Sequence, residues 1–365
     1  MLNIEKEDLA MPRGMLRSTR IEAADPLTAI ETYFEKGWTD GLPVVPATEE
    51  KIWAMLEAMG KQPGDILGEI PARARTITAE KLAINAVLAG CVPIYTPVLL
   101  AIVEALCDPA FSVHGPTAST SGMGILTIVN GPIGSQIGMN AGENLFGPGW
   151  RANATIGRAL RLLLRNVCGA VPGVLDRSCF GHPGKFTYCI AEDEAHSPWA
   201  PLHAERGIPP DESAVTLFAG ESPHQVANQT ASDPEAILAS IADAMVAGGR
   251  LSLSGQQFVV IIAGEHRRRL SERGWTKKDV RAWLGEHAVR SEEDLAGAGR
   301  LPAPETSEQA ARQYRAVTEP DDILVVAAGG DAGGYSVVIA GWSGRLHSQA
   351  VTMMIPPCPT CRVDA

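Results

Sequence analysis

The segment from residue 182 to residue 207, HPGKFTYCIAEDEAHSPWAPLHAERG, concentrates side chains that can move a proton or ligate a metal. It contains three of the chain's eight histidines, four carboxylates, one lysine and one arginine. General acid–base catalysis uses such groups when they are held in place beside a substrate. An alternative is that His203 only caps a turn and Glu205 pairs with Arg206. The catalytic groups expected here are Lys185, Glu192, His203 and Glu205.

A second set of polar residues could bind a substrate. The glycine-rich stretch from 130 to 150 is longer than a connection needs and carries several asparagines. In WRANATIGRALRLLLRNVCG three arginines share one helical face, and arginine holds a carboxylate with two parallel hydrogen bonds. They could meet a substrate or the acidic residues 192–194, or they could form an ordinary solvated or ion-paired face. The expected binding residues are Asn130, Asn140, Asn144, Arg158, Arg161, Arg165 and Arg206.

Cofactor signals are sparse. His114, His203 and His266 would form a three-imidazole site for a divalent transition metal if the fold brought them together. No HExxH or EF-hand pattern accompanies them. NGPIGSQIG lacks the lysine and the spacing of a phosphate-binding loop, and GGDAGG precedes a strand-like run, which predicts a hairpin. The sequence therefore predicts no nucleotide cofactor.

The cysteines suggest a reducing environment and one alternative chemistry. Cys91, Cys107 and Cys168 stand singly in apolar surroundings, which favours reduced core thiols. Cys358 and Cys361 form a single C-x-x-C near the end of the chain. Only four residues follow, too few for the helix that would lower a thiol pKa. This pair could be a redox dithiol, half of a zinc site shared with a second chain, or without function.

The expected secondary structure that positions these residues changes near residue 123, from helices alone to strands that alternate with helices. Residues 1–24 read as a flexible arm and 25–122 as a helical region. GILTIVNG, SAVTLFAG, QFVVIIAG and DDILVVAAGG read as buried strands that alternate with helices. The sequence predicts an α/β core, 123–342, with a mostly parallel sheet flanked by helices and two sub-domains at 123–220 and 221–342. Residues 343–365 form a tail. In such folds ligands bind beyond the carboxyl ends of the strands.

Composition and net charge exclude some classes of binding partner. The chain has 365 residues, 45% of them hydrophobic, and a net charge of −11. That charge argues against nucleic acid or an anionic membrane as the partner, because both require clustered positive charge. No apolar run reaches membrane-spanning length, and the amino terminus lacks the apolar part of a signal peptide. We expect a cytoplasmic homo-oligomer with a small-molecule substrate.

Longer stretches of the sequence can also be compared with known proteins. EKGWTDGLPVVPATEEKIWAML, GPGWRANATIGRALRLLLRN, GEHRRRLSERGWTKKDVRAWLGEHA and VVAAGGDAGGYSVVIAGW, with the 182–207 segment, resemble a bacterial family related to UGSC-type (seleno)proteins and thiol–disulfide oxidoreductases. The likeness covers roughly residues 35 to 342. The Cys/Sec-Gly-Ser-Cys motif that names the family is absent.

The residues together favour acid–base bond cleavage in a small polar or carboxylate-bearing molecule, by a lyase or hydrolase and with or without a metal. The alternatives are a thiol–disulfide oxidoreductase that uses Cys358 and Cys361, and a non-catalytic small-molecule-binding protein.

Overall fold

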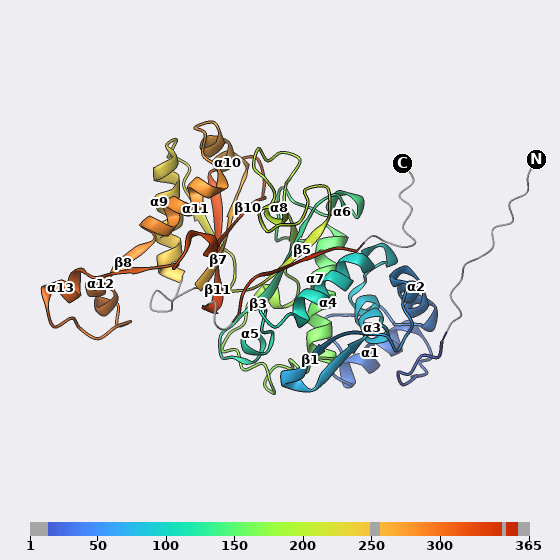
Figure 1. Ribbon diagram of the computed structural model, residues 1–365. Coiled ribbons are helices and arrows are strands. Elements are labelled where there is room, and N and C mark those ends of the chain that lie inside the picture. The colour runs from blue at the N-terminus through green and yellow to red at the C-terminus, as the bar shows by residue number, and fades with distance from the viewer. Residues whose placement is uncertain (1–13, 249–255, 345–347, 357–365) are drawn as a thin grey trace, which may run out of the picture.

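The computed structural model describes residues 14–248, 256–344 and 348–356. An eight-stranded sheet lies between layers of helices, as Figure 1 shows. The predicted α/β fold is therefore confirmed. Cys358 and Cys361 lie outside the described residues, and so does the arm up to residue 13.

The sheet consists of two halves with the same strand arrangement. In the first half a central strand has a parallel neighbour on its outer side and an antiparallel one on its inner side, and the second half repeats this pattern. The first half contains β3 (Gly124–Asn130), β4 (Cys189–Ala191) and β5 (Ala214–Gly220). The second contains β7 (Gln256–Ile262), β10 (Ile323–Ala327) and β11 (Tyr335–Gly344). The halves meet where Gly220 of β5 pairs with Gly341 of β11.

Each half also contributes one strand that pairs with a strand of the other half. β6 (His224–Ala227) follows β5 in the chain but pairs with β11. β12 (Val351–Met354) follows β11 but pairs with β5. The part of the expected tail that the structure describes is therefore built into the sheet of the first half, and the two halves are interlocked.

The prediction of a mostly parallel sheet is wrong, because the sheet is mixed. β5 and β11 both run antiparallel to their neighbours, although every residue of β5 is buried. A continuous apolar run reports burial on both faces and carries no information about strand direction. The predicted hairpin at GGDAGG is also wrong, since β10 and β11 flank β7 on opposite sides.

The sheet curls until its two outer strands approach each other. The backbone N–H of Asp193, just after β4, donates to the carbonyl of Ala327 at the end of β10, with N···O 2.7 Å. All six main strands contribute buried side chains to the core inside this curl. These include Leu126, Ile128, Ile190, Phe218, Val259, Ile261, Leu324, Val326 and Ile339. The curl brings the loops that follow β4 and β10 together.

Helices cover the outer face of the first half. Several of them have side-chain N-caps, with the side chains of Asp25, Thr48 and Thr78 accepting from backbone N–H groups of the first turns. Residues 17 and 18 donate their backbone N–H groups to Glu80, which ties the described part of the arm to α3. The elements are α1 (Pro26–Glu35), α2 (Glu49–Met59), β1 (Ile66–Ile70), β2 (Arg75–Thr78), α3 (Ala79–Ala89), α4 (Thr96–Cys107), α5 (His114–Ala118), α6 (Ile133–Gln136), α7 (Arg151–Asn166) and α8 (Leu202–Glu205).

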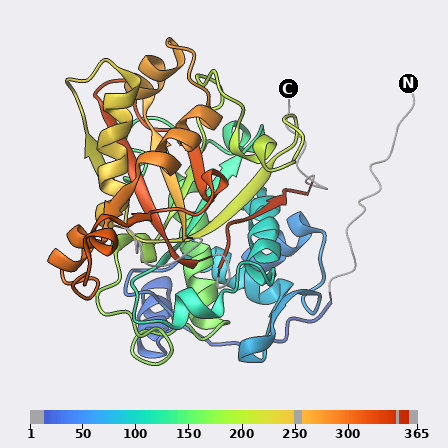
Figure 2. The same ribbon diagram turned by 60° about the vertical axis from the view of Figure 1, so that its left-hand side comes forward.

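The second half has its own helices and a projecting arm. Thr276 and Asp279 form a complete capping box at the start of α11. In Figure 1 α12 and α13 extend away from the body of the molecule, and Figure 2 shows the same fold with this side turned toward the viewer. The elements are α9 (Pro234–Gly248), α10 (Gly264–Ser271), α11 (Lys277–His287), β8 (Val289–Ser291), α12 (Glu292–Gly297), α13 (Ser307–Ala311) and β9 (Gln313–Arg315). The short 3-10 helices are η1 (Pro71–Arg73), η2 (Pro93–Tyr95), η3 (Pro183–Lys185) and η4 (Pro320–Asp322).

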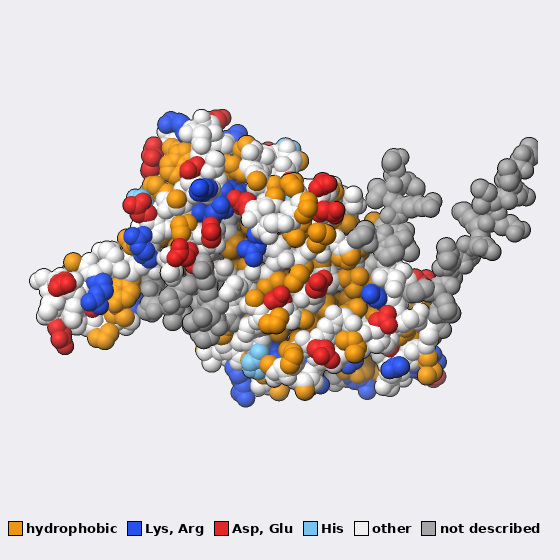
Figure 3. All heavy atoms as spheres, viewed as in Figure 1, with side chains coloured by type: hydrophobic (Ala, Val, Ile, Leu, Met, Phe, Trp, Pro, Cys, Tyr) orange, Lys and Arg blue, Asp and Glu red, His pale blue; other side chains and the backbone are white. Residues whose placement is uncertain are grey.

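The face seen in Figure 3 carries acidic and basic side chains interspersed with hydrophobic ones, rather than one large patch of a single sign. None of the helices in the described ranges has the length and apolar character that crossing a membrane requires.

Candidate functional site

Glu192, which directly follows β4, is a buried carboxylate with a full set of donors. Lys277 Nζ lies 2.6 Å from Oε1, and the backbone N–H of Ala327 donates to the same oxygen. Oε2 accepts from Asn130 Nδ2 and from the backbone N–H of Leu202, each at 2.7 Å. The side chains of Glu192 and Lys277 are only 1% and 2% exposed. These bonds join β3 and β4 of the first half to β10 and α11 of the second.

Glu194 lies two residues further on and is partly open to solvent, with 27% of its side chain exposed. It accepts from Asn130 Nδ2 at 2.9 Å and from the backbone N–H of Gly131 at 2.7 Å. Nδ1 of His203 is 3.9 Å from the same Glu194 oxygen. His203 is fully buried, and neither of its ring nitrogens has a hydrogen-bond partner among the described residues.

An exposed imidazole is attached to this cluster through Asp193. Nδ1 of His196 lies 2.8 Å from Asp193 Oδ1, while Arg267 Nη2 donates to Asp193 Oδ2, also at 2.8 Å. His196 is 74% exposed, whereas Arg267 is 3% exposed. The hydrogen bond and the charge of Asp193 raise the pKa of His196, and Asp331 adds to the effect. A buried arginine thus fixes the carboxylate, which in turn orients an accessible histidine.

The surrounding loops converge on this place. The backbone N–H of Gly329 donates to the carbonyl of Ala141, and that of Gly264 donates to the carbonyl of Gly330. The loops after β3, β4, β7 and β10 therefore meet at the edge where ligands commonly bind in open α/β sheets.

Three of the four expected catalytic residues lie in this region. Glu205 accepts from Arg281 Nη1 at 2.9 Å and lies 3.7 Å from Lys277 Nζ, so Lys277 connects it to Glu192. The alternative in which Glu205 pairs with Arg206 is wrong, because Glu205 binds Arg281. Arg206 instead reaches β12, where it bonds to Thr352 and to the carbonyl of Ala350. His203 is on the short helix α8 and is fully buried.

Lys185, the fourth expected catalytic residue, belongs to a different cluster. Its Nζ lies 2.9 and 2.8 Å from the two carboxylate oxygens of Asp176 and 2.6 Å from Ser178 Oγ. Arg161 Nη2 binds the same carboxylate at 2.9 Å. Burial opposes the charge of Asp176, but hydrogen bonds from Lys185, Ser178 and Arg161 outweigh it and hold the pKa of Asp176 well below its usual range. Burial lowers the pKa of Lys185, and Asp176 partly offsets this effect.

The arginine row of α7 binds its own chain and does not reach residues 192–194. Arg158 forms a two-bond pair with Asp40, with N···O distances of 2.7 and 2.8 Å. Arg165 donates to the carbonyl of Gly37. The acidic segment takes its cations from α10 and α11 instead, because the curl of the sheet brings the second half to it.

Two of the three expected asparagines shape their own loop. Asn140 donates to the carbonyl of Glu143 and accepts from the backbone N–H of Gly142. Asn144 adopts a positive φ of 57° and donates to the carbonyl of Pro148. Asn130 alone lies in the carboxylate cluster.

The expected three-histidine metal set is not assembled. Nδ1 of His114 lies 3.3 Å from Arg73 Nε, and His266 is held by Ser336 Oγ and the carbonyl of Asn228. His203 lies in a third environment beside Glu194. Within the described ranges no group of three or more histidine, cysteine or acidic side chains is arranged to hold a metal ion.

Sequence reasoning missed four residues of this region: Asp193, His196, Arg267 and Lys277. Asp193 and His196 stand three residues apart inside the segment already singled out, and that spacing could have identified them. Nothing local distinguishes Lys277 from its exposed neighbour Lys278, because only the packing of α11 against the first half buries it.

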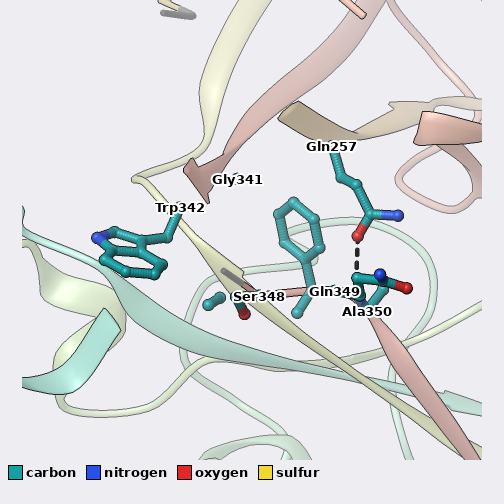
Figure 4. A pocket seen from close by; sticks show the side chains of 8 residues that line it. Gln257, Gly341, Trp342, Ser348, Gln349 and Ala350 are labelled. Carbon is teal, nitrogen blue, oxygen red and sulfur yellow. Dashed lines mark hydrogen bonds between the residues drawn. The ribbon is translucent and has the colours of Figure 1, made fainter. Parts of the chain in front are cut away.

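Two small pockets lie away from the carboxylate cluster. The first lies where β5 meets β11 (Figure 4), where the backbone N–H of Ala350 donates to Gln257 Oε1 at 2.8 Å. The second lies between α7 and the start of β3, and Lys185 and Arg161 are among its lining residues.

Neither a scan of protein-family models nor a search of curated proteins gives a match to this chain. The resemblance to the UGSC-related family therefore stays a prediction.

Proposed function

We propose that the protein is an enzyme that cleaves a bond in a small polar molecule by acid–base catalysis, as a hydrolase or lyase, with His196 as general base. The observation that carries this proposal is the chain of contacts from buried Arg267 through Asp193 to exposed His196. It combines a fixed orientation with access to solvent, which are the two properties that a catalytic base requires.

The hydrogen bond to Asp193 has a chemical consequence. When His196 is neutral, a proton on Nδ1 satisfies Asp193 and leaves the lone pair of Nε2 free to accept a proton. A carboxylate in this position also stabilises the imidazolium that forms when the base takes its proton. Arg267 prevents Asp193 from turning away, so we assign Arg267 the part of a positioning residue.

Glu194 is the second group that a substrate can reach from the same turn. Its partly exposed carboxylate is held by Asn130 and Gly131 and can accept a hydrogen bond from a substrate hydroxyl or amine. Glu192 and Lys277 lie beneath it and are almost fully buried. They position the loop and do not contact the substrate in this proposal.

The arginines no longer support a carboxylate preference at this site. Arg158, Arg161, Arg165 and Arg206 are all engaged by other parts of the chain. The substrate proposed for His196 is therefore a small polar molecule with a hydroxyl, amide or ester group.

The buried cysteines support a reducing compartment and are poor candidates for a redox nucleophile, whereas Cys179 is free and exposed. Cys91 and Cys168 are unpaired, and burial raises the pKa of each to about 12. Such thiols stay protonated at neutral pH and are poor nucleophiles. We accordingly propose a cytoplasmic location.

The proposal is tested by His196→Ala against a panel of small esters, amides and hydroxy acids. We expect turnover of a panel member to fall by about 10²- to 10⁴-fold, the usual contribution of general acid–base catalysis. His224→Ala is the matched control, because His224 is an exposed histidine on β6, and it should retain turnover. Equal turnover in the two variants would reject His196 as the base.

A further inference from the structure

Glu194 differs from its neighbours in the carboxylate cluster because no lysine or arginine of the described residues pairs with it. Glu192 and Asp193 are paired with cations from α11 and α10, respectively. The imidazole of His203 faces Glu194, but its Nδ1 lies 3.9 Å from Oε1, which is too long for a hydrogen bond. Because the Glu194 side chain is 27% exposed, its negative charge is available to a ligand that arrives from solvent.

Two buried side chains beside Glu194 have polar atoms without hydrogen-bond partners. His203 is fully buried, and both of its ring nitrogens lack a partner among the described residues. Asn130 is 1% exposed and donates to Glu194 through Nδ2, whereas its Oδ1 has no partner in that same part of the chain. Since buried polar atoms are rarely left without partners, two such side chains beside one carboxylate indicate a binding site.

The open positions at this site are hydrogen-bond acceptors. Asn130 and the backbone N–H of Gly131 both donate to Oε1 of Glu194, so Oε2 is left open within the described ranges. The amide oxygen of Asn130 can only accept, and a neutral imidazole offers one lone pair. Acceptors around a negative charge favour a ligand that brings N–H donors and a positive charge.

The neighbouring loops add exposed negative charge. Asp331, after β10, is 66% exposed and is close enough to contribute to the raised pKa of His196. Glu143, in the loop after β3, is exposed and packs against the loop that contains Asp331. Arg268 is 55% exposed and lies 3.9 Å from Asp331. Among these groups and Glu194, carboxylates outnumber the arginine three to one, which attracts cations to this edge of the sheet.

An ammonium group fits Glu194 better than a metal ion does. A metal would find one imidazole and one carboxylate, whereas catalytic zinc sites provide three such ligands, and no group of three forms within the described ranges. The charges of Glu192 and Asp193 are already balanced, so the cluster needs a single positive charge. A primary ammonium supplies that charge together with three N–H donors.

We infer that the substrate of the proposed enzyme carries a primary ammonium group, which binds the carboxylate of Glu194 while the reacting group lies at His196. The two residues are two positions apart, so their Cα atoms lie within about 7 Å of each other. The ammonium and the reacting group therefore belong to one compact molecule, such as an ester or amide of an α-amino acid. This inference rests on the proposed function for the reaction, but binding of the ammonium group can be measured without turnover.

Alaninamide and isobutyramide are matched probes, because the ammonium group of the first replaces a methyl group of the second. We expect alaninamide to bind the full chain at least about tenfold more tightly at about pH 6.5, where the α-amino group is charged. NMR titration should also show shifts of the ring signals of His196 and His203. Equal binding of the two probes, or no binding of alaninamide, would overturn the inference. So would binding of Zn²⁺ in place of alaninamide.

Glu194→Gln tests the charge directly. Glutamine keeps an acceptor for Asn130 and Gly131 but removes the negative charge, so alaninamide should lose its advantage over isobutyramide. Glu293→Gln is the matched control, because Glu293 is an exposed carboxylate on α12, which extends away from the body of the molecule (Figure 1), and both affinities should stay unchanged. If Glu194→Gln keeps the preference in a protein whose NMR spectrum shows a preserved fold, the ammonium group does not bind at Glu194.

His196→Ala separates this inference from the proposed function. It removes the proposed base and leaves Glu194 in place, so the preference for alaninamide should remain while turnover is lost. Surviving turnover together with an intact preference would reject His196 as the base and still support the ammonium site. A preference that disappears in His196→Ala would overturn the assignment of the ammonium group to Glu194.

Discussion

Two lysine–carboxylate pairs lie at opposite ends of β3 and differ in how completely their charges are compensated. Lys277 and Glu192 are both buried, and three further N–H donors complete the carboxylate. Lys185 shares Asp176 with Arg161 beside a pocket. The first pair is fully compensated and joins the two halves of the sheet, while in the second pair two cations share one carboxylate within the first half. The same residue types therefore form an isolated, fully satisfied pair in one place and a shared, partly exposed cluster in the other.

The largest effect that separates the two pairs is expected at Lys277. Lys277→Met leaves Glu192 as an unpaired buried carboxylate, and breaking a buried pair in this way costs about 3–5 kcal/mol. Lys278→Met removes an exposed cation from the same turn of α11 and should change the free energy of unfolding by less than about 0.5 kcal/mol. Urea denaturation of both variants measures the difference.

The double variant Lys277→Met, Glu192→Leu checks the cause. It removes both charges, so it should recover a substantial part of the stability that the single variant loses. A double variant as unstable as Lys277→Met alone would show that packing of the lysine stem, and not the uncompensated charge, accounts for the loss.

Lys185→Met should destabilise the protein less. Asp176 keeps Arg161 and Ser178 as partners, so the expected loss is about 1–3 kcal/mol, the usual cost of a hydrogen bond to a charged group. A loss as large as that of Lys277→Met would show that both pairs contribute equally to the free energy of unfolding. That result would contradict the comparison between them.

A smaller effect is expected on the stability of the protein at low pH. The pKa of Asp176 is lowered in the folded protein, so its contribution to stability is present above its unfolded pKa of about 3.9 and is lost as the pH falls through the folded pKa. Asp176→Asn should therefore flatten the decline of stability below about pH 4. A decline as steep as in the unmodified protein would assign this acid sensitivity to other carboxylates.

The sequence predicts the elements better than their assembly. Asp25 and Thr78 mark helix starts because a cap is a local interaction between a side chain and nearby N–H groups. The apolar runs mark the strands, but they do not show that β5 and β11 run antiparallel or that β6 and β12 cross to the other half. Those features depend on contacts between residues far apart in the chain.

The same limit applies to the candidate site. The arginine row of α7 was a possible partner for residues 192–194, yet the cation that binds Glu192 is Lys277. The segment 182–207 was recognised from its composition, but only the curl of the sheet shows that half of it lies beside α10 and α11. The composition of one segment carries no information about which distant residues pack against it.

The most direct test of the account compares the pKa of His196 with the pH dependence of turnover. NMR titration should give His196 a pKa above that of an ordinary histidine, and Asp193→Asn should lower it. Since a general base acts in its neutral form, kcat/KM should rise with pH through that same pKa and shift to lower pH in Asp193→Asn. A pH profile that stays in place while the His196 pKa moves would contradict the assignment of His196 as the catalytic base.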